Sequence, residues 1–206
     1  MPSTLVHVAV AGLVGTALLG RAFDRRAIAV VLLVATIPDL DAFAGLVLPG
    51  AHRALLHTSV LPALVGGLLW ADGRRQASVL RRRYGPRGVR VAWVALAGFV
   101  CGGLLPDLFT NGVNLLYPLH DAFYTVNGEA LLSSQRGFVQ TFVEIAPAAP
   151  QPTTETIHYS TGVDPAPGAE PATVDRVFPL AASGFELLLV LLGAFTVAVR
   201  LWEVDA

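Results

Sequence analysis

Charged residues and cysteine are both scarce in this sequence of 206 residues. Only 14% of the residues are charged, whereas a soluble domain carries about 25%, so the chain lacks the polar surface to cover itself with water. The single cysteine, Cys101, excludes a disulfide framework and a zinc site built from cysteines. The net charge of −1 and the absence of a basic tail argue against nucleic-acid binding, so we expect no nucleic acid among the partners.

Apolar residues are abundant instead: they make up 54% of the chain, and the mean hydropathy is +0.61. They are concentrated in five stretches, at about 5–20, 27–48, 54–71, 89–109 and 180–202. A helix that spans a bilayer needs about 20 predominantly apolar residues. The pattern therefore predicts an all-α fold, a polytopic membrane helix bundle with about five spans. The predicted organisation is a four-span core at 1–110, an external insert at 111–179, and a last transmembrane helix with its tail at 180–206.

Arginine supplies all 14 basic residues, and its distribution predicts the orientation. Three arginines follow the first apolar stretch, and seven lie between the third stretch and the start of the fourth. The segment around Gly50 holds only Arg53, and the insert holds only Arg136 and Arg176. Because cytoplasmic loops retain the arginine excess, both arginine-rich loops should face the cytoplasm. We therefore expect a multi-pass protein of the cell membrane, with its N-terminus and insert outside and its C-terminus cytoplasmic.

The insert is expected to be partly ordered. Residues 136–145 alternate between polar and apolar side chains, which predicts a strand. Residues 146–152 are rich in proline and alanine, a composition typical of a linker.

With this orientation, acidic and histidine side chains gather at the outer ends of four spans. They are His7 in the first span, Asp39 and Asp41 in the second, His52, Arg53 and His57 ahead of the third, and Asp107 in the fourth. Ionisable groups at membrane depth are costly and normally face the bundle interior or water, so each is a functional candidate. Imidazole nitrogens mixed with carboxylate oxygens suit zinc or another divalent transition ion. The sequence therefore predicts a metal site on the external face.

Local spacing refines this prediction. A proline directly before Asp39 and another directly before Asp107 should kink or end each helix at the acid. Asp39 and Asp41 can face one side only if the chain is extended there. His52 and His57, five residues apart, do not share a helix face, which favours a loop ligand followed by a helical ligand. Taken alone, His7 and Asp107 are more commonly interface residues, whereas apolar residues flank the Asp39 and Asp41 pair on both sides. The coincidence of these groups at four helix ends favours a site.

These residues resemble the motifs of a family of membrane-bound, metal-dependent hydrolases, also described as LexA-binding, inner-membrane-associated hydrolases. The resemblance covers about the first 120 residues. It consists of His7, Pro38-Asp39-Leu40-Asp41, His52-Arg53-Ala54-Leu55-Leu56-His57-Thr58-Ser59, Pro106-Asp107 and the stretch Gly112–Pro118. The family is distantly similar to zinc-dependent phospholipase C. The insert and the last span lie beyond the resemblance.

The resemblance implies a metal site and a reaction. The metal ligands would be His7, Asp39, Asp41, His57 and Asp107, and the ion a divalent metal, with zinc expected. The reaction would be hydrolysis of a phosphoester or lipid-like substrate, with membrane lipid as a partner. The metal would lower the pKa of water toward about 7 and polarise the phosphoryl oxygen. We further expect His52 or His120 to shuttle a proton and Arg53 to hold an anionic substrate oxygen.

One position departs from the family pattern. Gly103 stands where the pattern has a histidine, four residues before Asp107. Gly103→His should then raise the metal occupancy, unless His120 or His158 folds over from the insert to supply the ring. The departure also favours an alternative function, in which a non-catalytic membrane protein uses these acids and histidines for ion binding, transport or partner docking.

Overall fold

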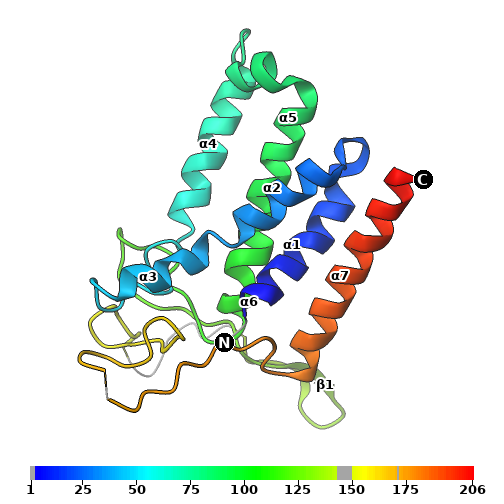
Figure 1. Cartoon of the computed structure of the whole chain (residues 1–206). Helices are drawn as coiled ribbons and strands as arrows, with labels where there is room; N and C mark the ends of the chain where they lie inside the picture. Colours follow the sequence, from blue (N-terminus) through cyan, green and yellow to red (C-terminus); the bar gives the residue numbers. More distant parts are fainter. Residues whose placement is uncertain (1–2, 143–149, 171) are drawn as a thin grey trace.

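The structure, a computed structural model, describes residues 3–142, 150–170 and 172–206. Its helices are α1 (Thr4–Leu19), α2 (Arg25–Ala35), α3 (Asp41–Gly45), α4 (Val60–Arg74), α5 (Val79–Gly98), α6 (Leu105–Leu108) and α7 (Gly184–Asp205). Two 3₁₀ turns, Gly20–Ala22 and Pro38–Leu40, and a π-helical turn, Phe99–Leu104, connect some of them. In Figure 1, α1, α2 and α5 lie between α4 and α7, and the insert lies at the end of the bundle where α1 begins.

Within the described residues, three helical segments are long and apolar enough to cross a membrane: Thr4–Ala22, Val79–Leu108 and Gly184–Asp205. A fourth crossing results if α2 and Pro38–Gly45, bent by 44° relative to each other, form one broken span. The predicted third span corresponds to α4. Its 15 residues are about 22 Å long, shorter than a hydrocarbon core of about 30 Å. The chain is a membrane protein with three or four supported spans, and the expectation of about five is not confirmed.

The insert contains a β-hairpin, so the fold is mostly helical rather than all-α. Strands β1 (Ala130–Ser133) and β2 (Gly137–Gln140) are antiparallel, with Leu131 opposite Val139. The strand predicted at 136–145 is thus confirmed for its first half. Residues 143–149, which include most of the predicted linker, lie outside the described residues.

The hydrophobic core lies where α1, α2 and α5 meet, and it includes Leu19, Ile28 and Val94. Helix α7 packs closely against α1 as well: a Cβ added to Gly193 would lie 2.6 Å from the carbonyl oxygen of Ala9. Small residues at such contacts are typical of membrane helix bundles, where they let backbones approach. The first turn of α1 lies beside the π-helical turn Phe99–Leu104, where a Cβ added to Gly102 would lie 2.8 Å from the carbonyl oxygen of His7. This contact positions the site described below.

The arginine-rich turns lie at the end of the bundle opposite the insert, together with the C-terminus (Figure 1). Arg25 at the start of α2 pairs with Asp205 at the end of α7, and Arg87 of α5 pairs with Asp24. The arginine-rich turns and the insert thus lie at opposite ends of the bundle, as the arginine distribution predicts. Which end faces the cytoplasm stays a prediction.

Candidate metal centre

The structure brings together the ionisable side chains that the sequence singles out, at the insert end of the bundle. His7 comes from the first turn of α1, Asp39 from the Pro38–Leu40 turn, Asp41 from α3, His52, Arg53 and His57 from the loop at 46–59, and Asp107 from α6. All of them except Asp39 are buried. Since α4 begins only at Val60, both loop histidines precede it, and the expected helical ligand is a second loop residue.

The break after α2 decides where the two acids of the second span point. Pro38 begins a 3₁₀ turn that runs into α3, so the chain is helical here and not extended. As a result the two carboxylates reach different groups. Asp39 approaches the ring of His7, and Asp41 accepts hydrogen bonds from the loop at 46–59.

Four potential ligand atoms face one another in the cluster: His7 Nε2, His57 Nε2, Asp39 Oδ1 and Asp107 Oδ2. His7 Nε2 lies 3.4 Å from Asp39 Oδ1 and 3.6 Å from Asp107 Oδ2. His57 Nε2 lies 3.7 Å from Asp39 Oδ1 and 2.8 Å from Asp107 Oδ2. Ligands about 2.0–2.1 Å from a tetrahedral zinc ion are about 3.3–3.4 Å apart. The four observed separations bracket this value, and the ligand atoms of His7, Asp39 and Asp107 all lie within 4.8 Å of one another. These three residues could therefore hold one small divalent cation, with His57 beside them.

Hydrogen bonds orient both imidazole rings toward this position. His7 Nδ1 lies 2.6 Å from the carbonyl oxygen of Gly102, and His57 Nδ1 lies 2.9 Å from Asp41 Oδ2. Both oxygens can only accept, so each Nδ1 donates, and Nε2 is the atom left for a metal. The two Nε2 atoms are buried and have no hydrogen-bond partner. The approach of His57 to Asp107 is therefore a close contact and not an aligned hydrogen bond.

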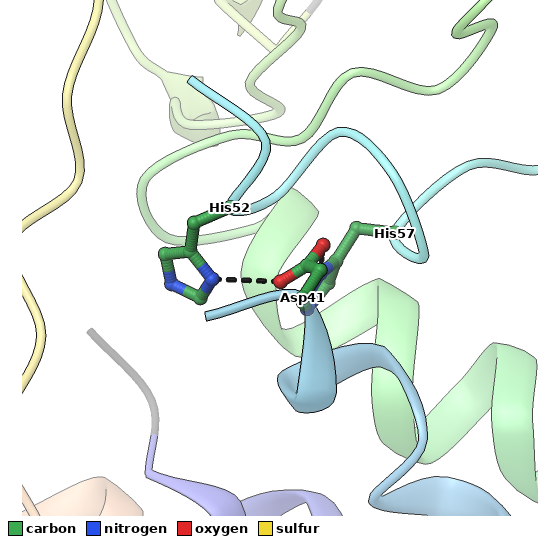
Figure 2. A group of neighbouring side chains, drawn as sticks. All are labelled: Asp41, His52 and His57. Atoms are coloured by element: carbon green, nitrogen blue, oxygen red, sulfur yellow. Dashed lines mark hydrogen bonds and ion pairs between the residues drawn. The ribbon is translucent and has the colours of Figure 1, made fainter. Parts of the chain in front are cut away.

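Asp41 is hydrogen-bonded through both carboxylate oxygens. Its Oδ1 accepts from His52 Nδ1 at 2.7 Å, and its Oδ2 accepts from His57 and from the backbone amides of Arg53 and Leu56. Figure 2 shows the rings of His52 and His57 on either side of this carboxylate. Asp41, His52 and His57 form one group whose ligand atoms lie within 4.8 Å of one another, and His7, Asp39 and Asp107 form another.

Arg53 is fully buried and holds several segments of the site together. Its guanidinium donates to Asp107 Oδ1 and to the carbonyl oxygen of Gly112, and it lies 4.8 Å from the centre of the Tyr159 ring. Its φ of 63° is in the left-handed region, which non-glycine residues rarely adopt. The buried Arg53 side chain is not among the residues that line the cavity of about 460 Å³ described below, and its expected contact with an anionic substrate oxygen stays a prediction.

The acids around His57 change its basicity. The residue lies in the loop before α4, outside the candidate spans. Burial lowers the pKa of its ring, but the Asp107 and Asp41 carboxylates outweigh this effect and raise the pKa to about 9. A metal ion must therefore displace a proton from this ring, because imidazole binds metals only in its neutral form.

Two histidines of the insert stay outside the cluster. His120 is exposed, with its ring 6.3 Å from that of Tyr124, and His158 lies 3.9 Å from a carboxylate oxygen of Asp164. Neither belongs to the groups of potential metal ligands among the described residues. His52 has a buried Nε2 without a hydrogen-bond partner, as does His158, but only His52 belongs to one of those groups.

The side chains of Thr4 and Tyr159 also contribute to the site, although neither was singled out from the sequence. Thr4 Oγ1 donates to Asp39 Oδ2, and the Tyr159 ring packs against Arg53. Thr4 precedes His7 by three residues, a spacing that places both on one helix face and could have revealed it. Nothing in the sequence indicates Tyr159.

Gly103 is required for close packing of the segments that carry the acids. A Cβ at this position would lie 2.8 Å from Pro38 Cγ and 3.0 Å from the carbonyl oxygen of Ala35. A histidine here would push the Pro38–Leu40 turn away from the π-helical turn Phe99–Leu104 and displace Asp39. The structure therefore argues against the expectation that Gly103→His raises the metal occupancy.

A cavity of about 460 Å³ adjoins the cluster, and Asp39 and His52 are among the residues that line it. The Asp39 side chain is 21% exposed, whereas those of His7, His57 and Asp107 are at most 2% exposed. The cluster is thus reached from solvent on the side of Asp39.

Residues 1–202 match the family model described as YdjM inner membrane protein, so the match includes the insert and most of α7 as well as the motif-bearing part. No curated protein and no solved structure gives a significant match. The description places the chain in a membrane and names no activity.

Proposed function

We propose that this chain, which belongs to the YdjM inner membrane protein family, is a membrane-bound, metal-dependent hydrolase of phosphoesters. The observation that carries this proposal is the pair of buried ring nitrogens, His7 Nε2 and His57 Nε2, which lack hydrogen-bond partners and face two carboxylates. Burying a polar atom without a partner is costly, so such atoms are an indication of a ligand.

The ligands in this proposal are His7, Asp39, His57 and Asp107. Two imidazole nitrogens and two carboxylate oxygens at the observed spacing suit zinc best. When bound, the ion supplies Lewis-acid activation of water and of a phosphoryl oxygen. Instead of ligation, we assign Asp41 the task of orienting His57 and His52, because hydrogen bonds already occupy both of its oxygens.

His52 is the proton acceptor in this proposal. Asp41 holds its Nδ1, which leaves Nε2 with a free lone pair in a residue that lines the cavity. A ring held in one tautomer by a carboxylate is suited to take a proton from an attacking water. The Asp39 side of the cluster opens toward the same cavity, so substrate, water and base can meet there.

The cluster also supports a second function, that of a non-catalytic ion-binding or docking protein. Four protein ligands can saturate a tetrahedral ion, as structural zinc sites do, and a catalytic ion needs a position open to water. Arg53 moreover already neutralises Asp107, so the fold has a charge-balanced form without metal.

Hydrolysis by the purified protein distinguishes these functions. With zinc present, the protein should hydrolyse bis(4-nitrophenyl) phosphate, and His52→Gln should lower kcat by about 100-fold, the scale of a lost general base, without changing the metal content. His120→Gln is the matched control and should match the parent protein, since His120 is exposed outside the cluster. Stoichiometric zinc without any hydrolysis would favour the non-catalytic function.

Cysteine labelling of intact cells tests the proposed orientation. Two exposed positions are suited to carry the label: Ser134 in the hairpin turn and Gln76 in the α4–α5 turn. Ser78 in the same α4–α5 turn is unsuitable, because it is buried and caps α5. In a Cys101→Ser background, a membrane-impermeant maleimide should label Ser134→Cys and should label Gln76→Cys only after lysis. The reverse pattern would place the cluster on the cytoplasmic side.

A further inference from the structure

The cavity beside the cluster is mostly apolar. Leu5 of α1 and Phe43 of α3 line it from the membrane helices, and Val163, Phe178 and Leu180 line it from the insert. Asp39 and His52 are among its polar lining residues, so one cavity adjoins both the proposed metal ligands and a large apolar surface. Apolar cavities of this size that carry a few polar groups are typical of sites for small organic ligands.

The cavity is continuous with the apolar outer surface of the bundle. Leu40 and Phe43 line it and are also 52% and 58% exposed. Leu46, Val47 and Leu48, which follow α3, are more than half exposed as well. Leu40 and Phe43 belong to the candidate broken span formed by α2 and Pro38–Gly45, so we infer that lipid covers this part of the surface. A hydrocarbon chain could therefore enter the cavity from the bilayer without passing through water.

Hydrogen bonds and close packing hold the insert side of the cavity in place. The Arg176 guanidinium donates to the carbonyl oxygens of Gly162 and Val163, at 3.1 and 3.0 Å. The Phe178 ring lies where a side chain at residue 162 would stand, 2.5 Å from the position of an added Cβ. Ser3 Oγ donates to the carbonyl oxygen of Leu180 at 2.6 Å, which joins this side of the cavity to the start of α1.

We propose that this cavity binds the hydrocarbon tail of an amphiphilic phosphoester, whose phosphate then lies at Asp39 and His52. The inference rests on the proposed function and narrows its substrate to a lipid-like phosphoester. The insert is then a specificity element, since Val163, Phe178 and Leu180 select for the tail while the bundle supplies the chemistry. An amphiphile with a single hydrocarbon tail matches the whole lining of the cavity. Its head group would lie at the carboxylate and imidazole, and its tail would lie against the aliphatic and aromatic side chains.

Two chromogenic substrates that share a head group test the tail site. Hexadecyl and butyl 4-nitrophenyl phosphate differ only in chain length. Val163→Trp adds bulk to the cavity at a lining residue of the insert that is not part of the cluster. It should lower kcat/KM for the hexadecyl compound at least 10-fold and change that for the butyl compound less than 2-fold. Leu132→Trp, which adds the same bulk on the exposed face of the hairpin, should change neither. Equal effects of Val163→Trp on both compounds would overturn the tail site and leave the hydrolase intact.

A photolabel separates failure of the tail site from failure of the hydrolase. Hexadecyl phosphate with a diazirine near the end of its chain should label residues 160–163 or 177–180, as mapped by mass spectrometry. An excess of unlabelled hexadecyl phosphate should suppress this labelling, whereas butyl phosphate should not. Labelling without hydrolysis of either substrate would support the tail site and overturn the hydrolase. Labelling confined to other segments would overturn the tail site.

Discussion

His57→Gln should reduce the zinc content of the purified protein from about one ion per chain to a trace. His57 is fully buried, and its Nε2 lies closest to Asp107 among the four potential ligand atoms. Loss of an outer hydrogen-bond partner of a metal ligand already costs about 10–100-fold in affinity, and loss of the ligand itself should cost more. Glutamine is chosen because its amide can still donate to Asp41 and keep the loop in place.

Metal content and thermal unfolding should report the same loss. Zinc at about 100 times its dissociation constant stabilises a protein that binds it by about 2.7 kcal/mol. The midpoint of unfolding of the parent protein should thus rise with zinc, and that of His57→Gln should not. His120→Gln is the matched control, the same substitution at an exposed histidine outside the cluster, and it should keep both the ion and the shift. Full zinc content in His57→Gln would show that this ring is not a ligand.

Arg53→Met should destabilise the metal-free protein by about 3–5 kcal/mol, the cost of removing one partner from a buried ion pair. The guanidinium is fully buried and bonded to Asp107, whose carboxylate would then lie in the interior without a cation. Methionine preserves much of the side-chain volume, and it keeps the strained left-handed backbone at this position unchanged. The lost charge is thus the main difference that unfolding in detergent micelles would measure.

Two further variants isolate the charge effect. Arg136→Met removes an exposed arginine of the hairpin and should change the free energy of unfolding by less than about 0.5 kcal/mol. Adding Asp107→Asn to Arg53→Met removes the unpaired carboxylate and should recover part of the loss, because the two residues are in direct contact. If the double variant is as unstable as the sum of the single ones, the ion pair does not account for the effect.

Some features of the fold follow from local sequence alone. Apolar runs of about 20 residues predict helices that span a membrane, and proline interrupts a helix through its own ring, which explains the break at Pro38. The start of α4, and with it the length of this helix, could not be predicted from local sequence. The apolar stretch at 54–71 continues across the loop, but His57 and Thr58 are held by Asp41 and by backbone carbonyls of Leu115 and Tyr117, so the helix begins later.

The types of residue in the site could also be predicted from the sequence, but the role of each residue could not. Motif spacing indicates that His57, Asp41 and Asp107 belong together, and it cannot tell a ligand from the residue that orients it. That difference depends on which oxygen faces which nitrogen, as in the hydrogen bonds that occupy both oxygens of Asp41. Arg53 is a further case: its charge suggests a contact with an anionic substrate oxygen, and only the tertiary structure shows that its side chain is buried against Asp107.

The sequence by itself determined that this protein lies in a membrane, and which residue types could bind a metal. These properties are sums over local composition, and they hold whatever the tertiary arrangement. Only the tertiary structure decided that Asp39 and Asp41 point to different partners and that Gly103 is a packing contact. It also decided that the insert walls a cavity beside the cluster. Each of these facts depends on distances between segments that are remote along the chain, and such distances are set by helix packing.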